Sequence, residues 1–164
     1  MNFTKITTDE KVLILDGAQV YGDVCFGEEC SVWYNAVIRG ELKPVRIGKR
    51  CNVQDNAVIH NETVLGDDVS VGHGAIVHGC TVGDRVMIGM GAILLDGAKI
   101  GNDCLIAAGA VVTGKTDAPD GSMLVGSPAK VVKELSEAQK AYIVKNGEEY
   151  LKKMRDYREH WLEK

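Results

Sequence analysis

Three histidines in the middle of the chain have a spacing that could bind a metal ion. His60 and His78 are 18 residues apart, and His73 lies between them. A neutral imidazole nitrogen is a common ligand of zinc and of other transition ions. Two polar residues, Gln54 and Asp55, shortly precede His60. The sequence can use these residues together only in a fold that brings positions about 18 apart into contact.

A repeat of six residues supplies such a fold. Large aliphatic residues recur at every sixth position in three runs, from Ile14 to Ile38, from Ile47 to Val77 and from Val82 to Val112. The fifth position of nearly every hexad is small or β-branched, and glycine often fills the second. A period of six fits neither a helix nor a long strand, but it fits a short strand plus a corner repeated around a prism. Three hexads form one triangular coil, and stacked coils pair as parallel strands about 4.8 Å apart.

The predicted fold class is therefore all-β: a parallel β-helix of hexapeptide repeats followed by a C-terminal α-helix. General rules favour right-handed crossovers, so the repeat alone does not predict a left-handed coil. We divide the chain into an N-terminal strand or lead-in (1–13), the β-helix (14–132) and a helix packed on the β-helix (133–164). The step of nine residues between Ile38 and Ile47 predicts a loop at 41–44, and a step of five after Val77 predicts a tightened corner.

The C-terminal helix has a start signal and an apolar face. Ser136 and Gln139 have the spacing of a capping box. Gly147 is a weak point or kink within the helix. The apolar positions, which we expect to pack along the prism, are Ile143, Tyr150, Leu151, Met154, Tyr157 and Trp161.

Composition excludes several classes of protein. The 19 Lys and Arg are outnumbered by 23 Asp and Glu and form no cluster, which argues against a nucleic-acid or anionic-membrane partner. No apolar run reaches the ~18 residues of a membrane-spanning helix, and the first residues lack a secretory signal pattern, so we expect a cytoplasmic protein. The 5 cysteines include no C-x-x-C pair, which disfavours a disulfide framework or a cysteine-only zinc site.

The repeat predicts where the three histidines lie on the prism. His60 and His78 occupy the same outward position on adjacent coils, close enough to hold one ion at Zn–N distances of about 2.0–2.1 Å. Arg39 belongs to the same column, one coil below. His73 begins a corner on the order of 10 Å away, with Asp55 beneath it. A third ligand would then come most economically from His73 of a neighbouring subunit around a three-fold axis.

Simpler interpretations remain open at this point. Outward histidines are often only solvated, and Arg39, Glu41 and Asp55 could form ordinary surface ion pairs. Cys30, Cys51 and Cys104 fall at inward corner positions, where a cysteine acts as a small hydrophobic residue. Cys80 is close enough in sequence to His78 to be considered as a thiolate ligand.

Several strings of this chain resemble the γ-class carbonic anhydrases and their shorter bacterial homologues. They are VIRGE at 37–41, NVQDNAVIH at 52–60, GHGAIVHG at 72–79, MGA at 90–92 and GSP at 126–128. The resemblance implies a left-handed β-helix and a homotrimer with a metal ion at each subunit interface. His60 and His78 would come from one subunit and His73 from the next.

The resemblance also implies an activity and roles for three further residues. The reaction would be the reversible hydration of carbon dioxide to bicarbonate, a lyase reaction performed by a metal-bound hydroxide. Gln54 would hydrogen-bond that hydroxide or the bicarbonate, while Arg39 and Asp55 would pair across the interface. Zn²⁺ is the expected ion, and Fe²⁺ or Co²⁺ would also suit imidazole ligands.

The chain departs from the family pattern at two neighbouring positions. Glu41 stands where the family usually has Asp, and Leu42 stands where an acidic residue would be expected. Glu62 lies two residues after His60, which is not the position of the missing loop acid, so it does not replace that acid. With no well-placed acid to carry the proton away, we expect proton release to be slow or dependent on buffer.

Two other functions are compatible with the sequence. A CoA-dependent acyltransferase on the same prism would need only one histidine, as a general base. A non-catalytic metal-binding trimer would hold the ion without hydrating carbon dioxide.

Overall fold

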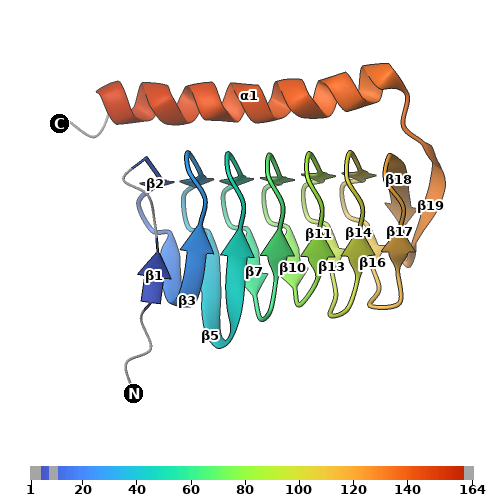
Figure 1. The fold of residues 1–164 in the computed structure, drawn as a ribbon, viewed down its shortest axis with the longest axis horizontal. Coiled ribbons are helices and arrows are strands. Elements are labelled where there is room, and N and C mark those ends of the chain that lie inside the picture. The colour runs from blue at the N-terminus through green and yellow to red at the C-terminus, as the bar shows by residue number, and fades with distance from the viewer. Residues whose placement is uncertain (1–4, 8–10, 161–164) are drawn as a thin grey trace.

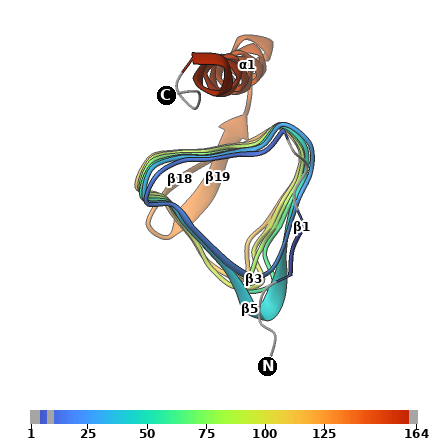
Figure 2. The same ribbon diagram turned by 90° about the vertical axis from the view of Figure 1, so that its left-hand side faces the viewer.

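A computed structural model describes residues 5–7 and 11–160 of the chain. The chain winds into a left-handed parallel β-helix of triangular cross-section, and one long helix lies over one of its three faces (Figure 2). In the side view the same helix runs along the stack of coils (Figure 1). The predicted fold class is confirmed, including the left-handed coil that the family resemblance implied.

Each face of the prism is a ladder of short parallel strands. The face under the helix, here called the helix face, holds β2 (Leu13–Ile14), β4 (Ser31–Val32), β6 (Asn52–Val53), β9 (Ser70–Val71), β12 (Met87–Ile88), β15 (Leu105–Ile106) and β18 (Ser122–Gly126). The antiparallel strand β19 (Ala129–Glu134) pairs with β18 and ends this sheet.

The other two faces form one continuous sheet that bends at a corner. The histidine face holds the first halves of β3 (Gln19–Phe26) and β5 (Val37–Ile47), then β7 (Val58–His60), β10 (Ile76–His78), β13 (Ile93–Leu94) and β16 (Val111–Val112). The third face holds the second halves of β3 and β5, then β8 (Val64–Leu65), β11 (Thr81–Val82), β14 (Lys99–Ile100) and β17 (Asp117–Ala118). Strand β1 (Lys5–Thr7) pairs with β3.

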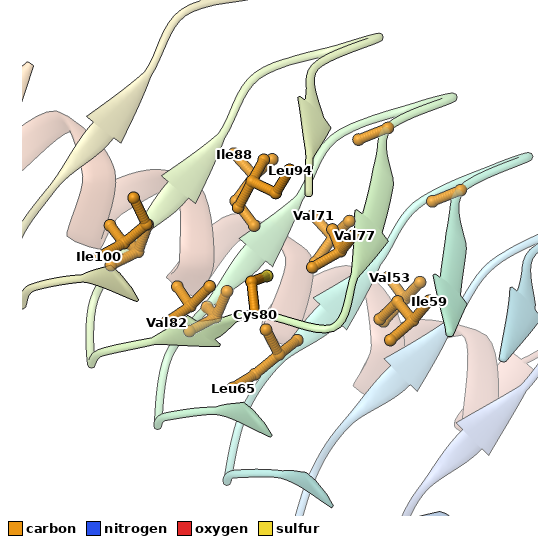
Figure 3. Packing of buried hydrophobic residues seen from close by; sticks show 14 of the residues in the cluster. Val53, Ile59, Leu65, Val71, Val77, Cys80, Val82, Ile88, Leu94 and Ile100 are labelled. Carbon is orange, nitrogen blue, oxygen red and sulfur yellow. The ribbon is translucent and has the colours of Figure 1, made fainter. Parts of the chain in front are cut away.

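The core is a narrow column that runs through the coils, as the hexad pattern predicts. Aliphatic residues point inward at mid-face, where Figure 3 shows Val53, Ile59, Leu65 and their equivalents on successive coils. Small residues fill the corners, and Ala57 is fully buried. Ile14 is 40% exposed because its strand is the last one of the helix-face sheet among the described residues.

Glycine in the second position of a hexad makes room for a ladder of side chains at one corner. Asp84 Oδ1 accepts the backbone N–H of Asp67 at 2.8 Å. A Cβ on Gly66 would lie 2.2 Å from that oxygen, which explains the glycine. The same 2.8 Å contact links other successive coils: Asp67 Oδ1 accepts the N–H of Lys49, Asn102 Oδ1 that of Asp84, and Asp120 Oδ1 that of Asn102.

The residues predicted to bulge from a corner as a loop, 41–44, do bulge there, although they lie within the bounds of strand β5. Strand β5 runs without a break through these residues and pairs with β3 along both halves, with a shift of register between Gly22 and Val24. The extra residues therefore extend the strand, and they project at the corner between the histidine face and the third face (Figure 2). Leu42 within this projection is 79% exposed.

Helix α1 (Glu137–His160) begins where the capping box predicts. The N–H of Gln139 donates to Ser136 Oγ at 3.3 Å, and the Gln139 side chain accepts the N–H of Ser136 at 3.1 Å. The helix continues unbroken through Gly147. Of its predicted apolar face, Ile143 and Met154 are buried and Tyr150, Leu151 and Tyr157 are partly buried, whereas Trp161 lies outside the described residues.

An edge-on aromatic cluster anchors the helix to the prism. The Trp33 ring lies 5.4 Å from the Tyr150 ring and 5.3 Å from the Tyr157 ring, measured between centroids. Trp33 itself is 5% exposed, and its indole N–H donates to Ser31 Oγ at 3.0 Å. Among the described residues, no helix combines the length and hydropathy needed to cross a membrane.

Candidate metal site on the histidine face

The predicted column of side chains is present on the histidine face. Strands β5, β7 and β10 pair so that Arg39 lies beside His60 and His60 beside His78. The two imidazoles meet with His60 Nδ1 and His78 Nε2 3.1 Å apart. Both rings are largely shielded, with 16% and 33% of the side-chain surface exposed.

This pair has the geometry that one shared ion requires. Two nitrogens bound to zinc at about 2.0–2.1 Å with a tetrahedral angle between them would lie roughly 3.3 Å apart. The observed 3.1 Å is within a few tenths of that separation. His60 and His78 therefore fit as two ligands of one divalent ion, with one nitrogen of each ring facing the other ring.

Each of the three histidines has a carboxylate beside its second nitrogen. Asp96 Oδ2 lies 3.0 Å from His78 Nδ1, and Asp55 Oδ2 lies 2.8 Å from His73 Nδ1. A carboxylate in this place accepts the ring N–H, so the other nitrogen keeps its lone pair for a ligand. This arrangement recurs around protein metal sites, where the carboxylate also sets the direction of the ring.

The third carboxylate, Glu41, has a looser contact. Its Oε1 lies 3.5 Å from His60 Nε2 and also accepts a charge-assisted bond from Arg39. Both Glu41 Oε2 and His60 Nε2 are buried atoms without a hydrogen-bond partner among the described residues. The backbone N–H of Glu41, followed by the nearby Arg39 guanidinium and His60, lowers the pKa of this carboxyl. Glu41 is therefore charged at neutral pH and places negative charge beside the histidine pair.

His73 lies at the corner between the helix face and the histidine face. Its side chain is 45% exposed, and its Nε2 lies 3.3 Å from the Tyr150 hydroxyl of α1. Burial, followed by the nearby Asp55 carboxylate, raises the pKa of Tyr150, so its hydroxyl remains protonated and can donate. Within residues 5–7 and 11–160 of one chain, no three His, Cys, Asp or Glu side chains converge on a common ion position.

A cavity of about 230 Å³ lies beside His73, between the helix face and α1. Gln54 lines it and is 5% exposed, and its amide N–H donates to Asn52 Oδ1 at 3.0 Å. Asn52 in turn donates to Ser70 Oγ at 2.8 Å. Asn146 from α1 lines the same cavity, and its Oδ1 is buried without a partner in the described structure. The cavity thus places polar groups of both the prism and the helix beside one histidine.

The cysteines do not join the candidate site. Burial, followed by the nearby Asp96 charge, raises the pKa of the Cys80 thiol to about 12, which excludes a thiolate at neutral pH. Cys30, Cys51 and Cys104 are free, buried and packed in the core column, as their corner positions predict.

The structure places the remaining predicted site residues in contacts within one chain. Arg39 donates to Glu41, and Asp55 pairs with His73. The pairing of Arg39 with Asp55 across an interface involves a second chain and stays a prediction. Glu62 forms an ion pair with Lys43.

Three contacts of this site were not predicted from the sequence. Asp96 follows His78 by 18 residues, so the coil period itself was a signal for this neighbour. Tyr150 and Asn146 could be found only once the helix was docked, because no repeat relates α1 to the coils. The predicted apolar face of α1 included Tyr150 but gave no sign that its hydroxyl would contact His73.

A stripe of aliphatic side chains runs beside the histidine column on the outer surface of the prism. Its members alternate with inward core residues along each strand, and they are Val37, Val58, Ile76, Ile93 and Val111. All five remain at least partly exposed, and Ile76 is 38% exposed. This stripe and the histidine pair lie on the same outward surface of the prism.

Comparisons with known proteins agree with this architecture. The sequence profile described as "Hexapeptide repeat of succinyl-transferase" matches residues 44–79, and the one described as "Bacterial transferase hexapeptide (six repeats)" matches residues 79–114. A crystal structure of a hexapeptide transferase family protein from Anaplasma phagocytophilum superposes with a TM-score of 0.90 at 35% identity, covering 93% of this chain and 92% of that chain.

Curated relatives extend the similarity to nearly the whole chain. The carbonic anhydrase of Geobacillus kaustophilus is 41% identical over 149 residues, covering 88% of this chain and 82% of that protein. The mitochondrial γ carbonic anhydrase 2 of Arabidopsis thaliana is 37% identical over 153 residues, which cover 87% of this chain. The chain spans only 55% of the length of that plant relative.

Proposed function

We propose that this chain, which belongs to the γ-class carbonic anhydrase family, is a metal-dependent carbonic anhydrase that reversibly hydrates carbon dioxide to bicarbonate. The observation that carries the proposal is the 3.1 Å approach of His60 Nδ1 to His78 Nε2 on adjacent coils. A divalent ion held by three neutral imidazoles lowers the pKa of a coordinated water toward about 7, which supplies hydroxide at neutral pH. Zinc suits this donor set, and ferrous or cobaltous ions suit it as well.

The third ligand in this proposal is His73 of a neighbouring subunit. His73 already has its N–H held by Asp55, so its Nε2 has a lone pair to offer. Within the described chain that lone pair accepts from the Tyr150 hydroxyl, a contact that an ion bound at Nε2 would replace. The aliphatic stripe beside His60 and His78 supports a second chain on the histidine face. A three-fold arrangement would bring the His73 corner of each chain onto the histidine face of the next.

The cavity beside His73 is the proposed place for carbon dioxide and bicarbonate. Gln54 has one amide N–H committed to Asn52, which fixes the amide plane and leaves its second N–H for the substrate anion. Asn146 and Tyr150 close the cavity from the helix side. These groups would orient the substrate and limit the entry of bulk water.

The acidic residues near the proposed site are poorly placed to carry the released proton to solvent. Glu41 is held between Arg39 and His60, and Glu62 is paired with Lys43. Leu42, an exposed residue of the β5 projection, cannot accept a proton. We therefore expect turnover to rise with buffer concentration, because external buffer must carry the proton away.

The direct test is stopped-flow hydration of carbon dioxide by protein loaded with zinc, with His78→Ala as the control. The proposal predicts hydration above the uncatalysed rate for the wild type and none for the variant. Equal rates for the two proteins would contradict it, and a rate insensitive to buffer concentration would contradict the proton-release argument.

Acyl transfer from coenzyme A is the second candidate. The contact between His73 and Asp55 has the form of a general base oriented by a carboxylate. The descriptions of both matching hexapeptide families also name transferases. Consumption of acetyl-CoA that survives His60→Ala but not His73→Ala would favour this activity. Zinc bound at full occupancy without either activity would favour a non-catalytic metal-binding trimer.

A further inference from the structure

We propose that Asp96 is a positioning residue of the metal site, which selects the ring tautomer of His78 and holds the ring in its binding direction. The inference rests on the proposed function. Asp96 Oδ2 lies 3.0 Å from His78 Nδ1, and the two residues come from successive coils. It is thus the closest carboxylate to either histidine of the pair, since Glu41 approaches His60 Nε2 only to 3.5 Å.

Two features of the neighbouring coils fix the Asp96 carboxylate in place. Asn61 Nδ2 donates to Asp96 Oδ1 at 3.3 Å, so each carboxylate oxygen has its own partner. Gly79 leaves the space that the carboxylate occupies, because a Cβ there would lie 1.9 Å from Asp96 Oδ1. The Asp96 side chain is 63% exposed, so its position depends on these contacts and not on burial.

The chemical consequence concerns the proton on the His78 ring. A carboxylate accepts a proton and cannot donate one, so Asp96 requires His78 to carry its hydrogen on Nδ1. The lone pair then lies on Nε2, the atom that faces His60 Nδ1. Without Asp96, no group within hydrogen-bond distance of His78 Nδ1 in the described structure selects this tautomer. Binding an ion would then first require the ring to reorient and exchange its proton.

The test compares Asp96→Ala and Asp96→Asn with Asp117→Asn. The Asn side chain at 96 can still accept the Nδ1 hydrogen through its amide oxygen, whereas Ala cannot. Asp117 is an exposed residue of the third face, so its variant removes the same charge from the same β-helix away from the histidines. The dissociation constant for zinc is measured by competition with a chromophoric chelator. The tautomer of His78 is read from imidazole ¹⁵N chemical shifts of the metal-free protein.

We expect Asp96→Ala to weaken zinc binding by about 10–100-fold, the usual effect of losing such a partner, and Asp96→Asn to weaken it less. Asp117→Asn should stay within about twofold of the wild type, because it leaves the histidines untouched. In the wild type the His78 hydrogen should reside on Nδ1, and Asp96→Ala should shift it toward Nε2. Zinc affinity for Asp96→Ala equal to that of Asp117→Asn would overturn the proposal.

The two readouts separate this proposal from the proposed function. Failure of the wild type to bind zinc would refute the metal site, and the ¹⁵N shifts would then decide the role of Asp96 alone. A His78 ring protonated on Nε2 in the metal-free wild type would refute that role. Should Asp96→Ala fail to fold, Asp96→Leu, which is close to Asp in size and has no acceptor, takes its place in the same two measurements, and an unchanged zinc affinity and unchanged ¹⁵N shifts for it would overturn the proposal.

Discussion

Replacing Ile76 by alanine should weaken the association of subunits without unfolding the chain. Ile76 belongs to the aliphatic stripe on the histidine face, and it is two residues from His78. Its side chain points away from the core column, so its truncation leaves the interior packing of Val77 unchanged. The prediction therefore isolates the surface that the proposed trimer needs.

The expected size follows from the exposed area of this side chain. An isoleucine exposes roughly 180 Å² in an extended chain, so 38% exposure leaves about 70 Å² for a partner to cover. Truncation to alanine would lose most of this burial, about 1.5 kcal/mol per subunit at ~25 cal/mol per Å². Three copies per trimer give about 4.5 kcal/mol, or roughly a 2,000-fold change in the association constant. Since the trimer midpoint concentration varies as the square root of that constant, it should rise about 40-fold.

Sedimentation velocity over a range of concentrations measures this midpoint, and Val64→Ala is the matched control. Val64 is 40% exposed and lies on the third face, away from the proposed interface. It should leave the midpoint where the wild type has it. A shift for Ile76→Ala no larger than that for Val64→Ala would refute the assignment of the histidine face as the interface.

Three further predictions concern the fold around the site. Trp33→Ala should lower the free energy of unfolding by ~3–5 kcal/mol in urea titrations, because the buried indole joins the prism to two tyrosines of α1; a loss below about 1 kcal/mol would contradict this. Gly79→Ala should destabilise more than Gly91→Ala in the same assay, because both have positive φ but only Gly79 meets a side chain where its Cβ would lie; equal losses would rule out the clash. Cys80, with its pKa of about 12, should resist iodoacetamide in native protein at pH 8 and react after denaturation; native labelling, followed by mass spectrometry, would show that the thiol is accessible and ionised.

The sequence predicted much of the prism because its geometry is periodic. A coil of three hexads places residues about 18 apart in adjacent strands, so counting alone brought Arg39, His60 and His78 into one column. The corner ladder of Asp67 and its equivalents is encoded in the same way, through the glycines that leave room for it. The repeat alone determines which residues of adjacent coils are neighbours, independently of the rest of the tertiary structure.

Features that cross between unrelated parts of the chain could not be predicted in this way. The contact of Tyr150 with His73 depends on how α1 lies over the helix face, and helix periodicity gives the apolar side of α1 but not the residues beneath it. The irregular step at 41–44 was visible in the spacing, but its form depended on strand pairing. Strand β3 pairs with β5 on both sides of the step, at Gly40 and at Val45, so the extra residues lie within the bounds of β5 and bulge between these two pairs.

The most direct test of a site shared between subunits is a mixing experiment with His60→Ala and His73→Ala. Each variant alone lacks one ligand at every interface, so its homotrimers should bind no zinc at the site. Chains unfolded together and refolded in equal amounts should recover zinc at about one quarter of the sites, because each mixed trimer has one interface that takes its intact residues from both variants. Zinc measured by emission spectroscopy at that level is the predicted result. No recovery in well-assembled mixed trimers would contradict a metal site built from two chains.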